Sequence, residues 1–210
     1  MLEEARRLGF LGPGPVEAHL RHAAGFAAAI RTEWPGALEL RSAVDLGSGG
    51  GVPALALAFE FPETEWLLVE VAVRRAAFLR TAVDLLGLPG GITVVEIRAE
   101  ELGRRAEHRA AHQLVVARGF GPPAVTAECA APLLVVSGRA VVSDPPGGAV
   151  GRWPVDGLSL LGMTPVAAVH AEGSTYQVLV QETECPSRYP RRVGVPAKRP
   201  LFWGGPAMGA

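Results

Sequence analysis

From residue 42 onward, short apolar runs alternate with segments of helical character, and this alternation most strongly constrains the fold. The runs that we expect to form strands are SAVDL (42–46), EWLLVE (65–70), ITVVEI (92–97), QLVVA (113–117), RAVVS (139–143), TPVAAV (164–169) and STYQVLVQ (174–181). Strands separated by helices pair in parallel, with helices covering both faces of the sheet. The last two runs are only a few residues apart and should pair antiparallel as a hairpin. The sequence therefore predicts an α/β protein with a mostly parallel, seven-stranded sheet.

Helical patterns precede the strands and separate them. Apolar residues recur at steps of three and four between Val16 and Trp34, and Pro35-Gly36 is expected to end that helix. Further helices are expected over 52–60 and over 72–86, the latter ended by Gly87, and a polar helical segment before residue 113. The Pro/Gly-rich stretch 143–154 is expected to be a loop.

A chain of 210 residues is expected to form one compact unit with three parts. These are a helical N-terminal extension (1–40), a ligand-binding α/β domain (41–185) and a basic, proline-rich segment (186–210) that packs on or flanks the same domain. No apolar stretch approaches 18 residues and the N-terminus lacks the apolar core of a signal peptide, so we expect a cytoplasmic protein without a membrane span. We expect a monomer.

Composition excludes several kinds of chemistry. All but one of the 20 basic residues are arginine; the exception, Lys198, lies in a proline-bounded segment, and no phosphate loop of the GxxxxGK[ST] type is present. Cys129 and Cys185 are too far apart for a metal-binding spacing and are expected to be buried, reduced thiols. The net charge of −1 gives no general nucleic-acid signature, so such a partner requires a local basic patch.

The glycine-rich loop after the first expected strand is the strongest ligand-binding signal. Gly47, Gly49 and Gly51 form G-x-G-x-G, and Val52 follows. Glycines let the main chain approach a ligand closely, at the carboxyl end of a parallel strand where ligands bind. The third glycine of the dinucleotide fingerprint is missing, so the loop favours a nucleoside cofactor without a pyrophosphate, with S-adenosylmethionine as the candidate. A tight turn made for packing alone is the alternative.

Other strand ends add candidates around the same crevice. Glu70 ends the second strand, where a carboxylate can accept hydrogen bonds from both ribose hydroxyls. Ala99 leaves space for an adenine ring, and Glu100 could accept from its amino group, although an acid at a helix start is also ordinary. Arg118 follows the fourth strand, beside the expected position of a donor methyl; a solvated salt bridge is the alternative.

The histidines and the basic C-terminal stretch are two further groups of candidate residues. His19 and His22 can share a helix face, but without a third ligand they predict no metal site, and His108 and His112 are interpreted as a solvated helix end. The stretch 188–200 has five cations and no acid, which favours phosphate and hence RNA binding over a merely solvated basic end. Its cations are Arg188, Arg191, Arg192, Lys198 and Arg199.

Four motifs together resemble the RsmG (GidB) family, which methylates guanine N7 in small-subunit (16S) ribosomal RNA. They are VDLGSGGGVPALALA, EVAVRRAAFL, RAEEL and the segment RYPRRVGVPAKRPL. The resemblance is close over residues 43–102 and 188–202, looser over 1–40 and poor over 119–187. It implies a Rossmann-like class I methyltransferase fold that uses S-adenosylmethionine, with ribosomal RNA or the small ribosomal subunit as partner.

The resemblance also implies roles for individual residues. Gly47 and Val52 would line the methionine end of the cofactor site, and Glu70 would hold the ribose. The adenine would lie against Ala99 and Glu100, and Arg118 would form a rim shared with the substrate. Guanine N7 has a free lone pair, so positioning supplies most of the rate and no catalytic base is assigned.

The sequence departs from the family after the fifth strand. The family usually has a lysine-glycine pair there, whereas this chain has VVSDPPGG, with Asp144 near the place of the lysine. The family's arginine motif also continues differently here, as RGFGPP. Two alternatives therefore stay open: a methyltransferase of the same fold acting on a small molecule or another RNA, and a non-catalytic cofactor-binding homologue.

Overall fold

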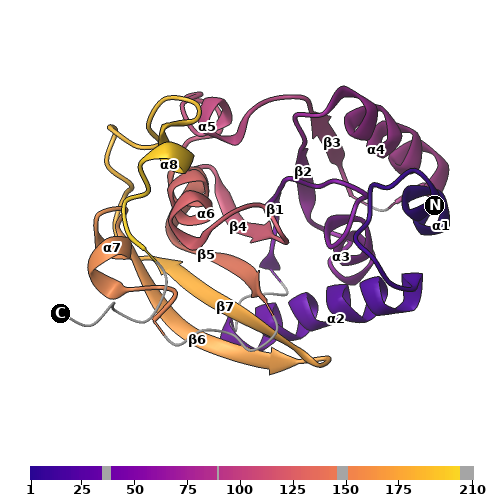
Figure 1. Cartoon of the computed structure of the whole chain (residues 1–210), viewed down its shortest axis with the longest axis horizontal. Coiled ribbons are helices and arrows are strands. Elements are labelled where there is room, and N and C mark those ends of the chain that lie inside the picture. Colours follow the sequence, from indigo (N-terminus) through magenta and orange to yellow (C-terminus); the bar gives the residue numbers. More distant parts are fainter. Residues whose placement is uncertain (35–38, 89, 146–150, 204–210) are drawn as a thin grey trace.

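A seven-stranded sheet forms the centre of the computed structural model, which describes residues 1–34, 39–88, 90–145 and 151–203 (Figure 1). The strands are β1 (Ser42–Leu46), β2 (Glu65–Val69), β3 (Ile92–Val95), β4 (His112–Ala117), β5 (Leu134–Asp144), β6 (Met163–Ala171) and β7 (Ser174–Gln181). Their order is β3-β2-β1-β4-β5-β7-β6. Strands β1 to β5 pair in parallel, and β7 is antiparallel to both β5 and β6. The predicted sheet and its C-terminal hairpin are confirmed.

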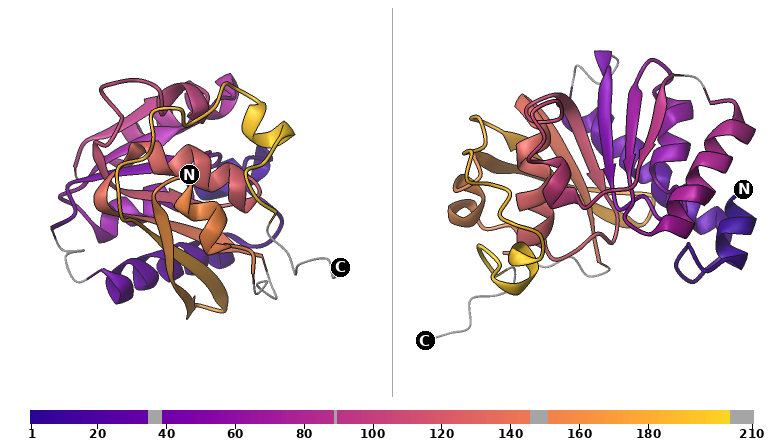
Figure 2. Two further views of the ribbon diagram at one scale, coloured as in Figure 1. Left: turned by 90° about the vertical axis from the view of Figure 1, so that its left-hand side faces the viewer. Right: turned by 90° about the horizontal axis from the view of Figure 1, so that it is seen from above.

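Helices cover both faces of this sheet, as the alternation of strands and helices predicted (Figures 1 and 2). The longer elements are α1 (Leu2–Arg7), α2 (Val16–Glu33), α3 (Ala54–Glu60), α4 (Val73–Leu86) and α6 (Pro123–Ala130). The shorter ones are α5 (Ala99–Leu102), α7 (Val155–Ser159), α8 (Val195–Lys198) and a 3₁₀ turn, η2 (Ala131–Leu133). Gly87 ends α4 in the left-handed conformation, as expected of a glycine at that place.

Two hydrophobic cores form because successive strand residues point to opposite faces. In β1, Ala43 joins the core under α1 to α4, whereas Val44 and Leu46 join the core under α5 to α7. The first core contains buried Trp66 and Phe26. None of the helices in the described part of the chain is long and apolar enough to cross a membrane.

The structure differs from the sequence prediction between β3 and β4. The expected polar helical segment is a single helical turn, α5, followed by turns up to residue 110. His112 belongs to β4 and is not at a helix end. The expected helix stop at Pro35-Gly36 and the middle of the loop 143–154 lie outside the described residues.

The segment after β7 is fastened to the domain. Tyr189, Cys185 and Phe202 are buried in the core under α5 to α7. Arg109 donates hydrogen bonds to the backbone oxygens of Cys185 (2.6 Å) and Tyr189 (2.8 Å). Residues 186–203 are therefore an integral part of the same folded body.

Candidate functional site

The register of the sheet brings together the first residues after strands β1, β2 and β4. Leu46 pairs with Val69 on one side and with Ala117 on the other. The residues that follow these three positions are Gly47, Glu70 and Arg118, so they meet at the carboxyl edge of the sheet. The chain reverses its strand order between β1 and β4, which is where open α/β sheets bind ligands.

The glycine loop is held close to the end of β2. The backbone N–H groups of Gly47 and Ser48 donate to the backbone oxygen of Val69, at 2.9 and 3.1 Å. Gly47, Gly49 and Gly51 have φ angles of 72°, 54° and 90°, which side chains rarely adopt. These conformations explain why the loop uses several glycines where an ordinary turn needs one.

Glu70 is the carboxylate around which this loop is organised. It is buried, and its Oε2 accepts the N–H of Gly49 at 3.0 Å while its Oε1 accepts the N–H of Ala72 at 2.8 Å. An ionised carboxylate offers about four acceptor positions, so each oxygen can accept one more hydrogen bond. Two hydroxyls on neighbouring carbons, as in a ribose, match that remaining capacity.

Asp45 is a buried acid that the motif pattern did not predict. Only 1% of it is exposed, and its Oδ2 has no hydrogen-bond partner. Its pKa is raised to about 7, mainly by burial and to a smaller extent by nearby Glu70, whereas Ser48, the backbone of Ala54 and Arg118 act in the opposite direction. The signal in the sequence was the acid two positions before the loop, and a buried oxygen without a partner marks a place for a donor or cation.

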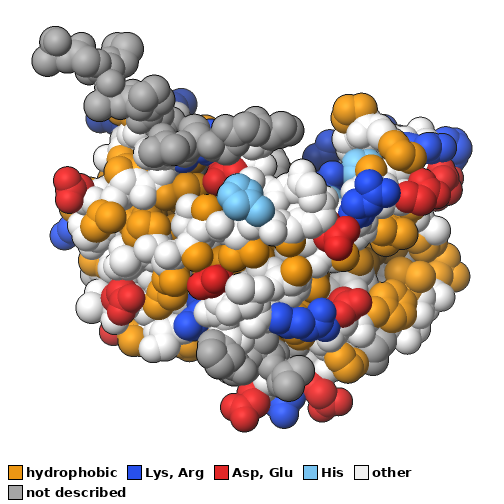
Figure 3. Space-filling view, turned by 90° about the horizontal axis from the view of Figure 1, so that it is seen from below, with side chains coloured by type: hydrophobic (Ala, Val, Ile, Leu, Met, Phe, Trp, Pro, Cys, Tyr) orange, Lys and Arg blue, Asp and Glu red, His pale blue; other side chains and the backbone are white. Residues whose placement is uncertain are grey.

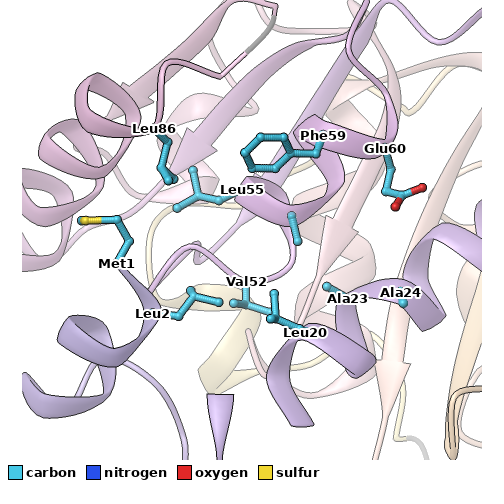
Figure 4. Close-up of a pocket in the computed structure, with 11 residues that line it drawn as sticks. Met1, Leu2, Leu20, Ala23, Ala24, Val52, Leu55, Phe59, Glu60 and Leu86 are labelled. Atoms are coloured by element: carbon cyan, nitrogen blue, oxygen red, sulfur yellow. The ribbon is translucent and has the colours of Figure 1, made fainter. Parts of the chain in front are cut away.

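Val52 follows directly on the glycine loop and is buried. Its side chain lines an apolar cavity of about 390 Å³ with residues of α1, α2, α3 and α4. Figure 4 shows Val52 among Leu2, Leu20, Leu55 and other apolar side chains.

Ala99 and Glu100 begin α5 next to the crevice. Ala99 is buried in the core under α5 to α7. Oε1 of Glu100 accepts the backbone N–H of Gly194 at 3.1 Å, a contact that the sequence did not predict. That oxygen fastens the C-terminal segment.

Arg118 turns towards helix α2. Its Nη2 lies 2.6 Å from Nδ1 of His19, whose Nε2 lies 3.2 Å from the backbone oxygen of Gly12. Since Arg118 can only donate, Nδ1 accepts and Nε2–H donates, which makes His19 a neutral imidazole. Burial is the main cause that lowers the pKa of His19, and the charge of Arg118 adds to it. Arg118 thus connects the N-terminal extension to the crevice.

The remaining histidines do not form a metal site. No group of three or more His, Cys, Asp or Glu side chains in the described residues could hold a metal ion. The ring of His22 packs 5.3 Å from that of Tyr176, and burial lowers its pKa to about 4. The interpretation of His112 as solvated was wrong: it starts β4, stacks 5.6 Å from His108, and neither ring nitrogen has a partner.

Asp144 is an ion-paired acid. Its Oδ1 accepts from Nε of Arg152 at 3.1 Å, and Nε1 of Trp153 donates to both oxygens at 3.2 and 3.4 Å. Only 5% of the Asp144 side chain is exposed. Asp144, which stands near the place of the family's lysine, is therefore paired with Arg152, eight residues further along the chain.

The five cations of the C-terminal segment separate into two kinds. Arg191 donates from Nε and Nη2 to the carboxylate of Glu128, at 2.8 and 2.6 Å, and Glu128 is completely buried. Its guanidinium therefore has a structural role, which the pattern of charges did not predict. The other four are exposed: Arg188, Arg192, Lys198 and Arg199.

On the face seen in Figure 3, acidic and basic side chains are interspersed among uncharged ones. That face offers no field of one sign. The exposed cations of the C-terminal segment remain the predicted phosphate-binding group.

The two cysteines behave as predicted. Cys129 and Cys185 are buried and free. Burial raises the pKa of both thiols, for Cys185 to about 11, so neither is a reactive thiolate near neutral pH.

Comparison with known proteins gives consistent matches. A family model described as rRNA small subunit methyltransferase G (GidB) matches residues 31–143. A ribosomal RNA small subunit methyltransferase G from Rubrobacter xylanophilus is 39% identical over 173 residues, covering 77% of this chain and 65% of that protein. The protein of the same name from Roseiflexus castenholzii is 37% identical over 167 residues, covering 76% and 70%. The chain thus spans about two thirds of the length of these relatives.

Solved structures share the fold at low identity. A Galdieria sulphuraria protein assigned as a sarcosine dimethylglycine methyltransferase superposes with a TM-score of 0.58 at 17% identity, over 71% of this chain and 64% of that chain. A mutant of MtNAS in complex with S-adenosylmethionine superposes with a TM-score of 0.54 at 14% identity, over 78% of this chain and 63% of that chain. At these identities the likeness shows the fold alone, which is that of class I methyltransferases.

Proposed function

Because the chain belongs to the GidB family, rRNA small subunit methyltransferase G, we propose that it transfers a methyl group from S-adenosylmethionine to guanine N7 of small-subunit ribosomal RNA. The observation that carries the proposal is that Gly47, Glu70 and Arg118 meet at the carboxyl edge of the sheet, where the strand order reverses. This edge of the sheet, in a chain of this family, is where a nucleoside cofactor is expected to bind.

The residues present fit S-adenosylmethionine. Glu70 has acceptor capacity for the two ribose hydroxyls, and the loop from Gly47 to Gly51 offers backbone without side chains. Asp45 supplies an unpartnered buried oxygen next to that loop, and the cofactor carries an ammonium group and a sulfonium. A cation at this place would favour the ionised form of Asp45, whose pKa burial otherwise raises to about 7.

The protein's contribution to the reaction is positioning. When bound, the cofactor supplies a methyl group activated by sulfonium. Guanine N7 has a free lone pair, so no side chain has to remove a proton before attack. The glycine loop and Glu70 hold one reactant, and the exposed cations of the C-terminal segment hold the phosphates of the other. Buried carboxylates near the crevice favour the positive charge that moves to the purine.

Incorporation of a tritiated methyl group tests the proposal. The full chain is incubated with labelled S-adenosylmethionine and either naked small-subunit RNA or assembled small subunits, and labelled nucleosides are identified by chromatography. We expect 7-methylguanosine. Absence of label on both substrates would overturn the RNA function.

A thermal-shift panel tests the cofactor separately. S-adenosylmethionine and its demethylated product bind the native state and should raise the melting temperature, whereas NAD should not. A shift with NAD alone would overturn the cofactor assignment.

A further inference from the structure

A second cavity, of about 550 Å³, lies where β4 and β5 end. The loop 119–125 forms one wall, Val142–Pro145 a second, and Pro200, Phe202 and Trp203 of the C-terminal segment a third. The cavity adjoins the glycine loop through Phe120, because Cδ2 of Phe120 lies 3.0 Å from the place that a Cβ on Gly47 would take. A molecule in this cavity lies next to the crevice assigned to the cofactor.

Aromatic side chains line this cavity. Trp153 and Phe202 are buried, whereas Trp203 is 82% exposed. A tryptophan left in solvent at the mouth of a cavity indicates a surface that a ligand covers. Nucleobases that are turned out of an RNA stack on aromatic faces in this way.

Asp144 is the polar group of the cavity wall. Arg152 and Trp153 hold its carboxylate, and Oδ2 takes only the 3.4 Å contact from Trp153. The carboxylate that pairs with Arg152 has no hydrogen to donate, so it can only accept hydrogen bonds. Oδ1 already accepts from both Arg152 and Trp153, so Oδ2 is the oxygen with acceptor capacity left, and two adjacent N–H groups of an occupant can both donate to it.

Guanine is the base with that donor pattern. Its Watson–Crick edge presents N1–H beside the N2 amino group, and both can donate to one carboxylate. Adenine and cytosine have an unprotonated ring nitrogen at the corresponding place, and uracil flanks its single N–H with carbonyl oxygens that a carboxylate repels. N7 lies on the opposite side of the purine, so a guanine held by this edge keeps N7 free.

We propose that this cavity receives the acceptor guanine, turned out of the RNA, and that Asp144 selects it by accepting from N1–H and the N2 amino group. The proposal rests on the function proposed above and adds the determinant of base specificity. Arg152 is a positioning residue that holds the carboxylate. Phe120 and Trp203 provide stacking surfaces for the base and for its neighbour in the strand.

The test uses a short RNA containing the modified position, once labelling has located it, with guanine or inosine at that position. Inosine keeps N1–H and N7 but lacks the N2 amino group. We expect kcat/KM of the wild-type protein to fall roughly tenfold on inosine, the size typical of losing one good base contact. In D144N, kcat/KM on guanine should fall roughly tenfold or more, and inosine should cause little further loss, because contacting groups are coupled.

Controls separate folding from recognition. D156N removes an exposed acid of α7 and should behave as wild type on both substrates. W203A changes a side chain that is 82% exposed, so it should fold normally while raising KM about tenfold through lost stacking. If D144N does not fold, the proposal is still tested by the rates of the wild-type protein on guanine and inosine and by the KM of W203A.

Equal rates on guanine and inosine, or independent losses from D144N and inosine, would overturn the proposal. If the RNA is methylated and all variants match the wild type, this inference fails while the proposed function stands. If no RNA is methylated, both fail.

Discussion

The two halves of the carboxyl edge of the sheet are built in different ways. The side proposed for the cofactor comprises Glu70 and the loop from Gly47 to Gly51, which is held by backbone contacts to the neighbouring strand and by Glu70 itself. The side proposed for the acceptor comprises the ends of β4 and β5 with the C-terminal segment, and its contacts join residues far apart in sequence, as in the pairs Glu128 with Arg191 and His19 with Arg118. The cofactor side is therefore a local structure, whereas the acceptor side depends on closure of the whole chain.

The largest expected effect comes from breaking that closure. R191Q leaves Glu128 buried and without its charged partner, so we expect the free energy of unfolding to fall by about 3–5 kcal/mol in denaturant titration. R192Q changes the exposed neighbour and should alter stability by about 0.5 kcal/mol or less. Equal stability of the two variants would contradict the structural role of Arg191 and remove the contrast between the two sides.

The next effect concerns the buried acid of the cofactor side. The pKa of Asp45 is raised to about 7 from an ordinary value of 3.8, mainly by burial, so between these pH values the folded protein holds a proton that the unfolded chain has released. Stability contributed by Asp45 is therefore lost as pH rises from about 4 to 7. D45N should gain stability over the wild type in that window, by about 2–4 kcal/mol, in thermal or denaturant unfolding.

The difference in stability between D45N and the wild type separates the contribution of Asp45 from that of the histidines. His22 and His112, whose pKa values burial lowers to about 4, give the opposite slope between about pH 4 and 6.5 in both proteins. Their contribution cancels in the difference. A pH-independent difference between D45N and the wild type would show that Asp45 is not desolvated as described.

A third effect measures the cofactor side directly. E70Q exchanges one acceptor oxygen for an amide that cannot accept, so we expect affinity for S-adenosylmethionine to fall by about 2–3 kcal/mol in calorimetry. E65Q changes the exposed acid at the other end of β2 and serves as the control. Unchanged affinity in a folded E70Q protein would break the assignment of the crevice.

The smallest effect distinguishes two glycines of one loop. A Cβ on Gly51 would lie 2.3 Å from Cδ1 of Leu55, whereas on Gly49 the nearest atom would be the backbone oxygen of Phe10 at 3.5 Å. Both positions have positive φ, so G51A should cost about 1–2 kcal/mol more stability than G49A. Equal melting temperatures would mean that the loop relaxes around the added methyl group.

Much of the cofactor side could be predicted from the sequence because its signals are local. Strands β1 and β2 are mainly apolar, and the glycine loop and Glu70 follow directly on them. Asp45 lay inside the same motif, but an acid in a strand does not reveal whether its oxygen finds a partner.

The contacts of the acceptor side could not be predicted from the sequence because they join residues far apart in the chain. Glu128 is the only charged residue between Arg118 and Arg139, which could have marked it as a buried acid that needs a partner. Nothing in the pattern indicated that the partner is Arg191, since the basic segment looks alike at every arginine. The segment before β4 was assigned to a helix from its composition, yet it forms turns, and His112 is part of the strand.

The pairing of Glu128 with Arg191 also has a consequence for folding during synthesis, because the two residues leave the ribosome at different times. The two residues are 63 positions apart, so a ribosome adding about 5–20 residues per second delivers the arginine roughly 3–13 seconds after the glutamate. During that interval Glu128 of helix α6 has no Arg191 to pair with, because that residue has not yet been synthesised. The half of the molecule assigned to the cofactor can assemble first, and the half assigned to the acceptor is completed last.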